Sequence, residues 1–125
     1  MVNSFEAAQL CAEAADNKKA FDILILDLRS LTYIADYFVI CSAGNTTQVA
    51  AISDGIGQVL AKAGIHPSHI EGETEATWVL MDYGDIVVHI FDEQTRIYYS
   101  LEKLWGDAPR IPAAARQKSL QGISS

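Results

Sequence analysis

Two carboxylates flank a short turn in the second half of the chain, where a pair of acids could do chemistry. Asp82 and Asp85 stand on either side of Tyr83-Gly84. Such a pair can bind Mg²⁺ or serve as general acid and base. The spacing argues against both roles, because in a two-residue hairpin these side chains lie opposite each other, where Asp is common for local hydrogen bonding. Asp27 and Asp36 also lie near strand ends, and we predict no metal site at either pair.

Other polar motifs give equally little support for catalysis. The run from 42 to 46, Ser-Ala-Gly-Asn-Thr, joins a predicted strand to a helix, where backbone amides can hold an anion. It has one Gly and lacks the Lys of a phosphate-binding loop, so a plain turn capped by Asn45 or Thr46 is favoured. His66 and His69 straddle a proline and would not share a helix face as metal ligands do. No Ser or Cys has an evident base, so we predict no enzyme and no cofactor.

The informative cluster is aromatic. Trp and Tyr are frequent binding hot spots, because each removes a large area from water and keeps a polar group. We expect Trp78 and Tyr83 to be exposed in a binding site, and Tyr98 and Trp105 to lie in the core. His89 alternates with apolar neighbours and is expected to face outward beside acidic residues. Six of the eleven aromatic residues lie within 28 positions: Trp78, Tyr83, Phe91, Tyr98, Tyr99 and Trp105.

Composition indicates one acidic domain. The chain has 125 residues, is 50% hydrophobic and carries a formal net charge of -7, which disfavours direct binding to DNA or RNA. No Lys or Arg occurs between Lys62 and Arg96. That stretch either attracts a basic partner or is an ordinary solvated face, and composition alone leaves both open. The acidic residues in it are Glu71, Glu73, Glu75, Asp82, Asp85, Asp92 and Glu93.

The two cysteines and the chain ends indicate a reducing compartment. Cys11 and Cys41 suit neither a disulfide framework nor a metal site, and we expect both to be small core residues. The N-terminus lacks the basic and apolar regions of a signal peptide, and no stretch approaches the ~20 apolar residues of a membrane span. We therefore expect a cytoplasmic protein.

Hydrophobic periodicity places the elements. Asn3 and Glu6 form a predicted capping box, and a helix follows as far as Asp16 or Lys19. Apolar runs over 22–28 and 37–42 predict buried strands. A long helix with apolar residues from Val49 to Ala63 then ends at Gly64.

The second half predicts a hairpin and a last helix. The segment 78–91 forms the hairpin about Tyr83-Gly84, and Ile97 to Trp105 shows the spacing of one amphipathic helix. This order predicts a single α/β domain of the α+β type, a mixed sheet of four to five strands covered by helices, with the fifth strand near 65–71. The domain is expected to span 1–108, and 109–125 to form a disordered C-terminal tail.

Three segments carry a resemblance to a known family. They read Trp-Val-Leu-Met-Asp-Tyr-Gly-Asp-Ile-Val-Val-His-Ile-Phe over 78–91, Ala-Asp-Tyr-Phe-Val-Ile over 35–40, and Tyr-Ser-Leu-Glu-Lys-Leu-Trp over 99–105. Together they resemble the ribosomal silencing factor family, also called Iojap, with a match from about Phe5 to Ala108.

The resemblance implies both a fold and a function. The implied fold has nucleotidyltransferase-like topology without the catalytic site, and here no Gly-Ser pair opens the long helix and no Asp-x-Asp lies on a following strand. The implied function is binding to the large ribosomal subunit through its fourteenth protein. Bound there, the factor blocks association with the small subunit and represses translation, especially under nutrient limitation.

Carried onto this sequence, the resemblance implies a partner-binding site on the hairpin. Residues 74–76 read Thr-Glu-Ala where relatives place a Gly before the tryptophan, and Asp92 replaces a frequent His or Asn, so contacts by Glu73 or Glu75 do not carry over. A nucleotide-dependent transferase and a homodimer through the hairpin remain alternatives. The implied site residues are Trp78, Asp82, Tyr83, Gly84, Asp85 and His89, with Asp36 and Tyr37 as further candidates.

Overall fold

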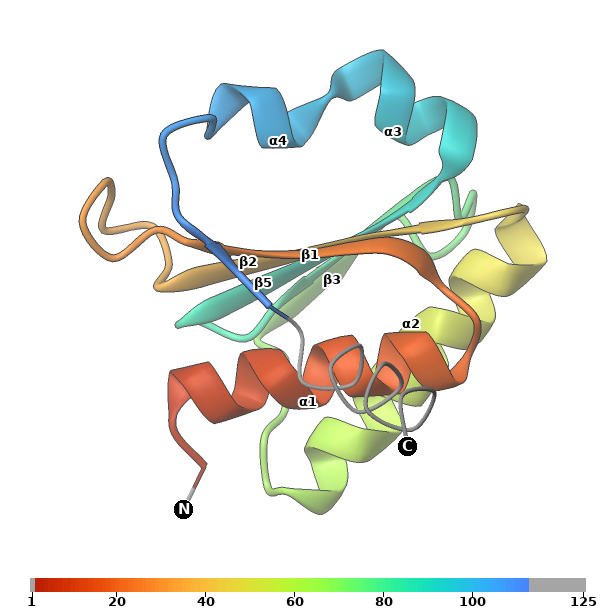
Figure 1. Ribbon diagram of the computed structural model, residues 1–125. Helices are drawn as coiled ribbons and strands as arrows, with labels where there is room; N and C mark the ends of the chain where they lie inside the picture. The colour runs from red at the N-terminus through yellow and green to blue at the C-terminus, as the bar shows by residue number, and fades with distance from the viewer. Residues whose placement is uncertain (1, 113–125) are drawn as a thin grey trace, which may run out of the picture.

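A mixed six-stranded sheet forms the centre of the computed structural model, which describes residues 2–112 (Figure 1). The strand order is β3-β4-β5-β2-β1-β6; β2 and β5 are parallel and all other neighbours are antiparallel. The predicted mixed sheet is confirmed, and β3 is the fifth strand expected near 65–71. The strands are β1 (Phe21–Asp27), β2 (Tyr37–Ala43), β3 (His69–Glu71), β4 (Trp78–Asp82), β5 (Ile86–Asp92) and β6 (Arg110–Ile111).

Two capped helices cover one face of the sheet. Before α1 (Ser4–Asn17), the Asn3 side chain accepts from the Glu6 amide at 2.8 Å, and the Asn3 amide donates to the Glu6 carboxylate. Before α2 (Thr46–Lys62), Asn45 accepts from the Gln48 amide at 2.8 Å. These bonds satisfy amides that a helix start leaves unpaired. The capping box and the plain turn at 42–46 are therefore confirmed.

The larger core lies between this face and the two helices. Alternate residues of β2 and β5 point into it, while α1 contributes small alanines and α2 contributes larger side chains such as Ile52 and Leu60. Cys11 and Cys41 lie in this core as free thiols, as predicted. Burial raises the pKa of both, that of Cys41 to about 12, so neither is a thiolate near neutral pH.

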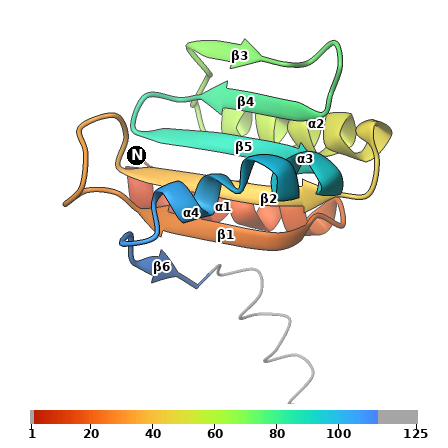
Figure 2. The same cartoon turned by 90° about the horizontal axis from the view of Figure 1, so that it is seen from above.

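The opposite face carries a shorter, broken helical segment. Asp92 caps α3 (Glu93–Tyr99), and Ser100 adopts a left-handed conformation with φ of 47° before α4 (Leu101–Leu104). The single helix predicted from Ile97 to Trp105 is therefore wrong. No residue of α3 or α4 is fully buried. Figure 2 shows the α3–α4 segment above β5, β2 and β1, with β3 and β4 beside it and uncovered.

The C-terminal part of the described chain also departs from the sequence prediction. Arg110 and Ile111 form β6, which pairs with Leu26 and Ile25 of β1, so a disordered tail from 109 onward is wrong for these residues. The rest of the predicted tail, 113–125, lies outside the described residues, and the domain boundary stays a prediction. Within residues 2–112, no helix has the length and apolar character needed to cross a membrane.

Candidate functional site

The predicted site residues fall into two groups at opposite ends of the β4–β5 hairpin. Trp78 pairs with Phe91 at one end, and the connecting turn follows Asp82 at the other. Asp82 follows Trp78 by four positions of extended chain, about 13 Å at ~3.3 Å per residue. Two of the predicted residues, Tyr37 and His89, are buried, so the predicted set does not form one exposed surface.

The turn has the predicted length of two residues but lies one residue later in the sequence than predicted. Asp82 pairs with Val87 and the Tyr83 amide donates to the Ile86 carbonyl at 2.9 Å, so the two turn residues are Gly84 and Asp85, and Asp82 and Asp85 are not opposite each other. Gly84 has a φ of 87°, the conformation expected of it, and its amide donates to Asp82 Oδ1 at 2.8 Å. Among the described residues, no group of three or more His, Cys, Asp or Glu side chains could hold a metal ion.

Three more predicted site residues lie at the turn end, and each is buried or makes contacts within the domain. Tyr83 is partly buried against the α1–α2 core, and its hydroxyl is buried without a partner among the described residues, so its predicted exposure is wrong. Burial raises the pKa of Tyr83 to about 12. The Asp36 amide donates to the Asp85 carbonyl at 2.7 Å, and the Asp36 carboxylate accepts from Ser4 Oγ at 3.0 Å. Tyr37 is 2% exposed and cannot meet a partner directly.

Trp78 and His89 meet at the other end, under α3. Trp78 Nε1 donates to His89 Nδ1 at 3.1 Å, and the Trp78 ring lies 4.8 Å from Phe91 and 4.9 Å from Tyr99, centroid to centroid. Trp78 is partly buried and packs against the smaller core on this face. The Trp78 ring thus links the sheet to α3.

His89 is 4% exposed, so its predicted outward orientation is wrong. Alternation along β5 predicts one solvated face, but this strand is covered on both sides, by α1 and α2 below and by α3 and α4 above. Burial lowers the pKa of His89 to about 4, so the imidazole is neutral at pH 7. Because Nδ1 accepts from Trp78, the proton is on Nε2, which is buried and has no partner within residues 2–112.

The α3–α4 segment exposes apolar residues that the sequence interpretation assigned to the core. Tyr98 is 81% exposed, so its predicted burial is wrong, whereas Trp105 is partly buried and packs against Phe38 at 5.9 Å. The break at Ser100 is the cause, since it turns half of the expected apolar face outward. No signal in the sequence marked that break. We call the following residues the apolar surface: Trp78, Ile97, Tyr98, Tyr99 and Leu104.

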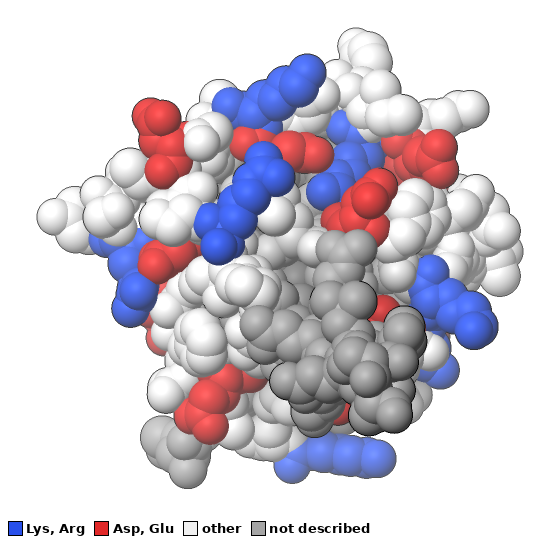
Figure 3. Space-filling model, viewed as in Figure 1, with Lys and Arg blue, Asp and Glu red and all other residues white. Residues whose placement is uncertain are grey.

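An acidic loop lies beside the Trp78 end of this surface. Glu71, Glu73 and Glu75 are all exposed. The loop passes close to β4, because a Cβ on Gly72 would come within 2.0 Å of the Trp78 carbonyl oxygen. On the side seen in Figure 3, by contrast, acidic and basic side chains alternate, and uncharged side chains project between them over α3 and α4. No large patch of one sign is seen on that side.

Comparison with known proteins decides the family. The family model described as "Ribosomal silencing factor during starvation" matches residues 2–124. This chain belongs to the ribosomal silencing factor family. The resemblance found in the sequence is therefore confirmed.

Individual relatives of the silencing factor family match most of the chain. Ribosomal silencing factor RsfS of Bacillus subtilis is 46% identical over 86% of this chain and 92% of its own length. The protein of the same name from Halalkalibacterium halodurans is 44% identical over 85% and 91%. A solved structure from Chromobacterium violaceum superposes with a TM-score of 0.82 at 32% identity, covering 90% of this chain and 93% of that one. The mixed α/β fold of this chain is thus shared with that solved structure.

Proposed function

We propose that this silencing factor binds the large ribosomal subunit through its fourteenth protein, blocks association with the small subunit and represses translation when nutrients are limited. The observation that carries this proposal is the apolar surface beside the acidic loop. Relatives named for ribosomal silencing supply the kind of partner. The proposal has the protein acting on ribosomes in the cytoplasm.

The chemistry of the surface suits a basic protein partner. Tyr98, Ile97 and Leu104 are largely exposed. The Trp78 ring contacts Tyr99, which in turn contacts Tyr98. Exposed aromatic residues at the centre of an interface contribute most of its binding energy, and complementary charge at the rim speeds association. The loop carboxylates stand at such a rim, where they would meet Lys or Arg of the ribosomal protein.

In this proposal the apolar surface contacts the ribosomal partner directly, and the turn end of the hairpin contributes less to binding. His89 and Tyr37 are buried, so they act by holding Trp78 and the strand ends in place. Asp85 and Gly84 are exposed at the far end of the hairpin. Asp85 contributes through long-range attraction of the basic partner, and Asp82 shapes the turn by accepting from the Gly84 amide.

A protein that represses translation by blocking the joining of the ribosomal subunits needs no catalytic activity. The structure favours no second function. The transferase alternative was motivated by the fold resemblance and by Asp82 and Asp85. Asp82 accepts from the Gly84 amide within the turn, and residues 2–112 hold no group of three or more His, Cys, Asp or Glu side chains that could bind a metal ion. Calorimetric titration with ATP and Mg²⁺ tests this alternative directly. Heat of binding that is abolished by Asp82→Asn would revive it.

Co-sedimentation with isolated large subunits tests the proposed function. Tyr98→Ala is the cleanest variant, because this side chain is 81% exposed and its loss disturbs little packing. As a hot spot it should weaken binding by about 2 kcal/mol, roughly thirtyfold in Kd. Trp78→Ala should weaken binding at least as much, although it also removes the donor to His89 Nδ1.

The matched control is Tyr33→Ala, since Tyr33 is a fully exposed aromatic residue in the β1–β2 loop, outside the apolar surface. Equal losses from Tyr33→Ala and Tyr98→Ala would overturn the assigned surface. Absence of co-sedimentation by the unmutated protein would overturn the function. Asp85→Lys should slow association and leave dissociation nearly unchanged.

Self-association through the same surface is a related prediction. An apolar surface that binds a partner can also pair two copies of the chain. Light scattering on the protein alone should then show a dimer that Tyr98→Ala converts to a monomer, and addition of the ribosomal protein should displace the second copy.

A further inference from the structure

A cavity of about 620 Å³ opens beneath the α3–α4 segment at the β1 edge of the sheet. Leu24 and Phe21 line its apolar side, and Ser42 lies at the end of β2. This volume is in the range of small-molecule sites, which combine an apolar wall with a few polar groups. The cavity is separate from the apolar surface, since the only apolar-surface residue among those that line it is Ile97.

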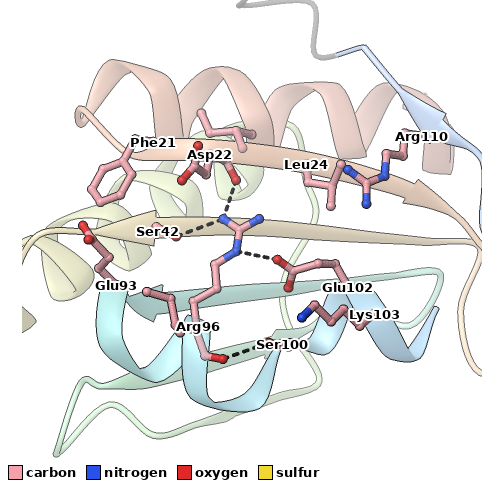
Figure 4. Close-up of a pocket in the computed structure, with 12 residues that line it drawn as sticks. Phe21, Asp22, Leu24, Ser42, Glu93, Arg96, Ser100, Glu102, Lys103 and Arg110 are labelled. Carbon is pink, nitrogen blue, oxygen red and sulfur yellow. Dashed lines mark hydrogen bonds and ion pairs between the residues drawn. The ribbon is translucent and has the colours of Figure 1, made fainter. Parts of the chain in front are cut away.

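The Arg96 side chain lies in the cavity and bonds to groups on three of the segments that line it. Its side chain is 11% exposed; Nη1 donates to Ser42 Oγ at 2.9 Å and to the Asp22 carbonyl, and Nε donates to Glu102 at 3.2 Å. Nη2 has no acceptor among the described residues. In Figure 4 this unbonded nitrogen lies on the side toward Leu24 and Arg110. The guanidinium is therefore fixed in place with donors left for a ligand.

Two more cations line the same end without an ion pair. Lys103 of α4 and Arg110 of β6 both border the cavity, and neither forms an ion pair within residues 2–112. Glu102 already offsets the charge of Arg96. The remaining acids, Asp22 and Glu93, lie near Phe21 at the other end in Figure 4. Lys103 and Arg110 thus add two unpaired positive charges at this end of the cavity. The Glu102 carboxylate lies between Arg96 and Lys103 in Figure 4, and its Oε1 is buried without a partner within residues 2–112.

We infer that this cavity binds a small phosphate monoester with a planar or apolar body. A phosphate monoester carries about -1.5 to -2 charges at pH 7, which matches the two unpaired cations. The Arg96 fork can donate to phosphate oxygens in fixed geometry, as arginine commonly does. The body of the ligand would lie over Leu24 and Phe21. No reaction is implied, and residues of α3 and α4 already line the cavity opposite β1.

Calorimetry on the full chain with AMP as the probe tests this inference. AMP should bind at one saturable site, while inorganic phosphate and adenosine, which each supply half of the ligand, should bind at least about tenfold more weakly. Lys103→Ala and Arg110→Ala should each weaken AMP binding at least about fivefold. Both side chains are exposed, so the variants should keep the melting temperature of the parent.

Lys62→Ala is the matched control, because it removes one exposed positive charge at the end of α2, outside the cavity. Absence of saturable AMP binding, or an equal loss from Lys62→Ala, would overturn the inference. Amide shifts on AMP addition should centre on Leu24, Ser42 and Arg96, and shifts confined to other regions would overturn it as well. Large-subunit co-sedimentation is a separate readout, so AMP binding without it would contradict only the proposed function.

Discussion

The two faces of the sheet are covered in opposite ways. On one face, α1 and α2 bury apolar side chains completely, and Leu60 is 0% exposed. On the other, neither α3 nor α4 buries a residue fully, and Leu104 is 74% exposed. The first face supplies most of the hydrophobic stabilisation, since that term follows the apolar area removed from water. The second face exposes apolar side chains, and we propose that the ribosomal partner covers them.

The largest expected effect is on the free energy of unfolding. It should appear when a leucine is replaced by alanine on one face of the sheet and not on the other. Leu60→Ala should lower the free energy of unfolding by about 3 kcal/mol, because it removes buried methyl groups and leaves a cavity. Leu104→Ala should change it by less than ~0.5 kcal/mol, as for other exposed positions. Urea denaturation of both variants measures the difference. Similar losses in the two variants would show that the α3–α4 segment is as tightly packed as the helices below.

A second comparison concerns how the acidic loop is held against Trp78. Gly72 and Gly84 both have φ near 87°, but a Cβ on Gly72 would come within 2.0 Å of the Trp78 carbonyl oxygen, whereas one on Gly84 meets nothing within 4 Å. Gly72→Ala should therefore cost roughly 2–3 kcal/mol from strain and overlap together, and Gly84→Ala about 1 kcal/mol from strain alone.

Thermal denaturation measures the stability lost by each variant. Tryptophan fluorescence in a Trp105→Phe background, where Trp78 is the only tryptophan, shows whether the Gly72→Ala change reaches Trp78. A shift of the emission maximum is expected only in Gly72→Ala, because only there must the backbone of β4 move. If both variants lose the same stability and neither shifts the emission, the loop does not position Trp78.

The face with α1 and α2 was the predictable one. Strong periodicity, the Asn3 capping box and Asn45 define the helices, and long apolar runs define β1 and β2. These signals are local in sequence, and the packing agrees with them. The antiparallel β4–β5 hairpin was predictable for the same reason, because alternating apolar residues lead into and out of Gly84.

The face covered by α3 and α4 was predicted less well, because its features depend on contacts between residues distant in sequence. Nothing local distinguishes Ile97 to Trp105 from a continuous helix; the break at Ser100 coincides with the hydrogen bonds from Arg96 to β1 and β2. For His89, alternation reports which way a side chain points and not whether a second layer covers it. Trp78 was expected to be exposed and is partly buried, whereas Tyr98 was expected in the core and is exposed.

The next prediction concerns the pH dependence of the free energy of unfolding, with an expected change of about 2 kcal/mol. It tests whether water is excluded from the space beneath α3. Burial lowers the pKa of His89 to about 4 from an ordinary value of 6.5, so the unfolded chain binds a proton that the folded chain does not. The resulting stability is present above pH 6.5 and is lost as the pH falls toward about 4. Between pH 7 and pH 5 the loss should be about 2 kcal/mol.

His89→Asn keeps an acceptor near the position of Nδ1 but cannot titrate, so it should remove this part of the pH dependence. The measurement is urea denaturation of parent and variant at both pH values. Identical pH dependence in the two proteins would mean that water reaches the imidazole and that the α3–α4 segment does not seal the sheet.

The smallest expected effect concerns the start of the α3–α4 segment. Asp92 Oδ1 accepts from the Thr95 amide at 2.8 Å, and Asp92→Ala should cost about 1 kcal/mol of helix stability. Because α3 buries no residue, this loss should appear as local opening: faster hydrogen exchange of α3 amides with little change in the global unfolding free energy. Asn45→Ala removes the equivalent cap from α2, which is embedded in the core, and should instead lower global stability by a similar amount. If Asp92→Ala also lowers the global free energy of unfolding, the α3–α4 segment unfolds together with the rest of the domain. It would then not open independently of the helices on the other face.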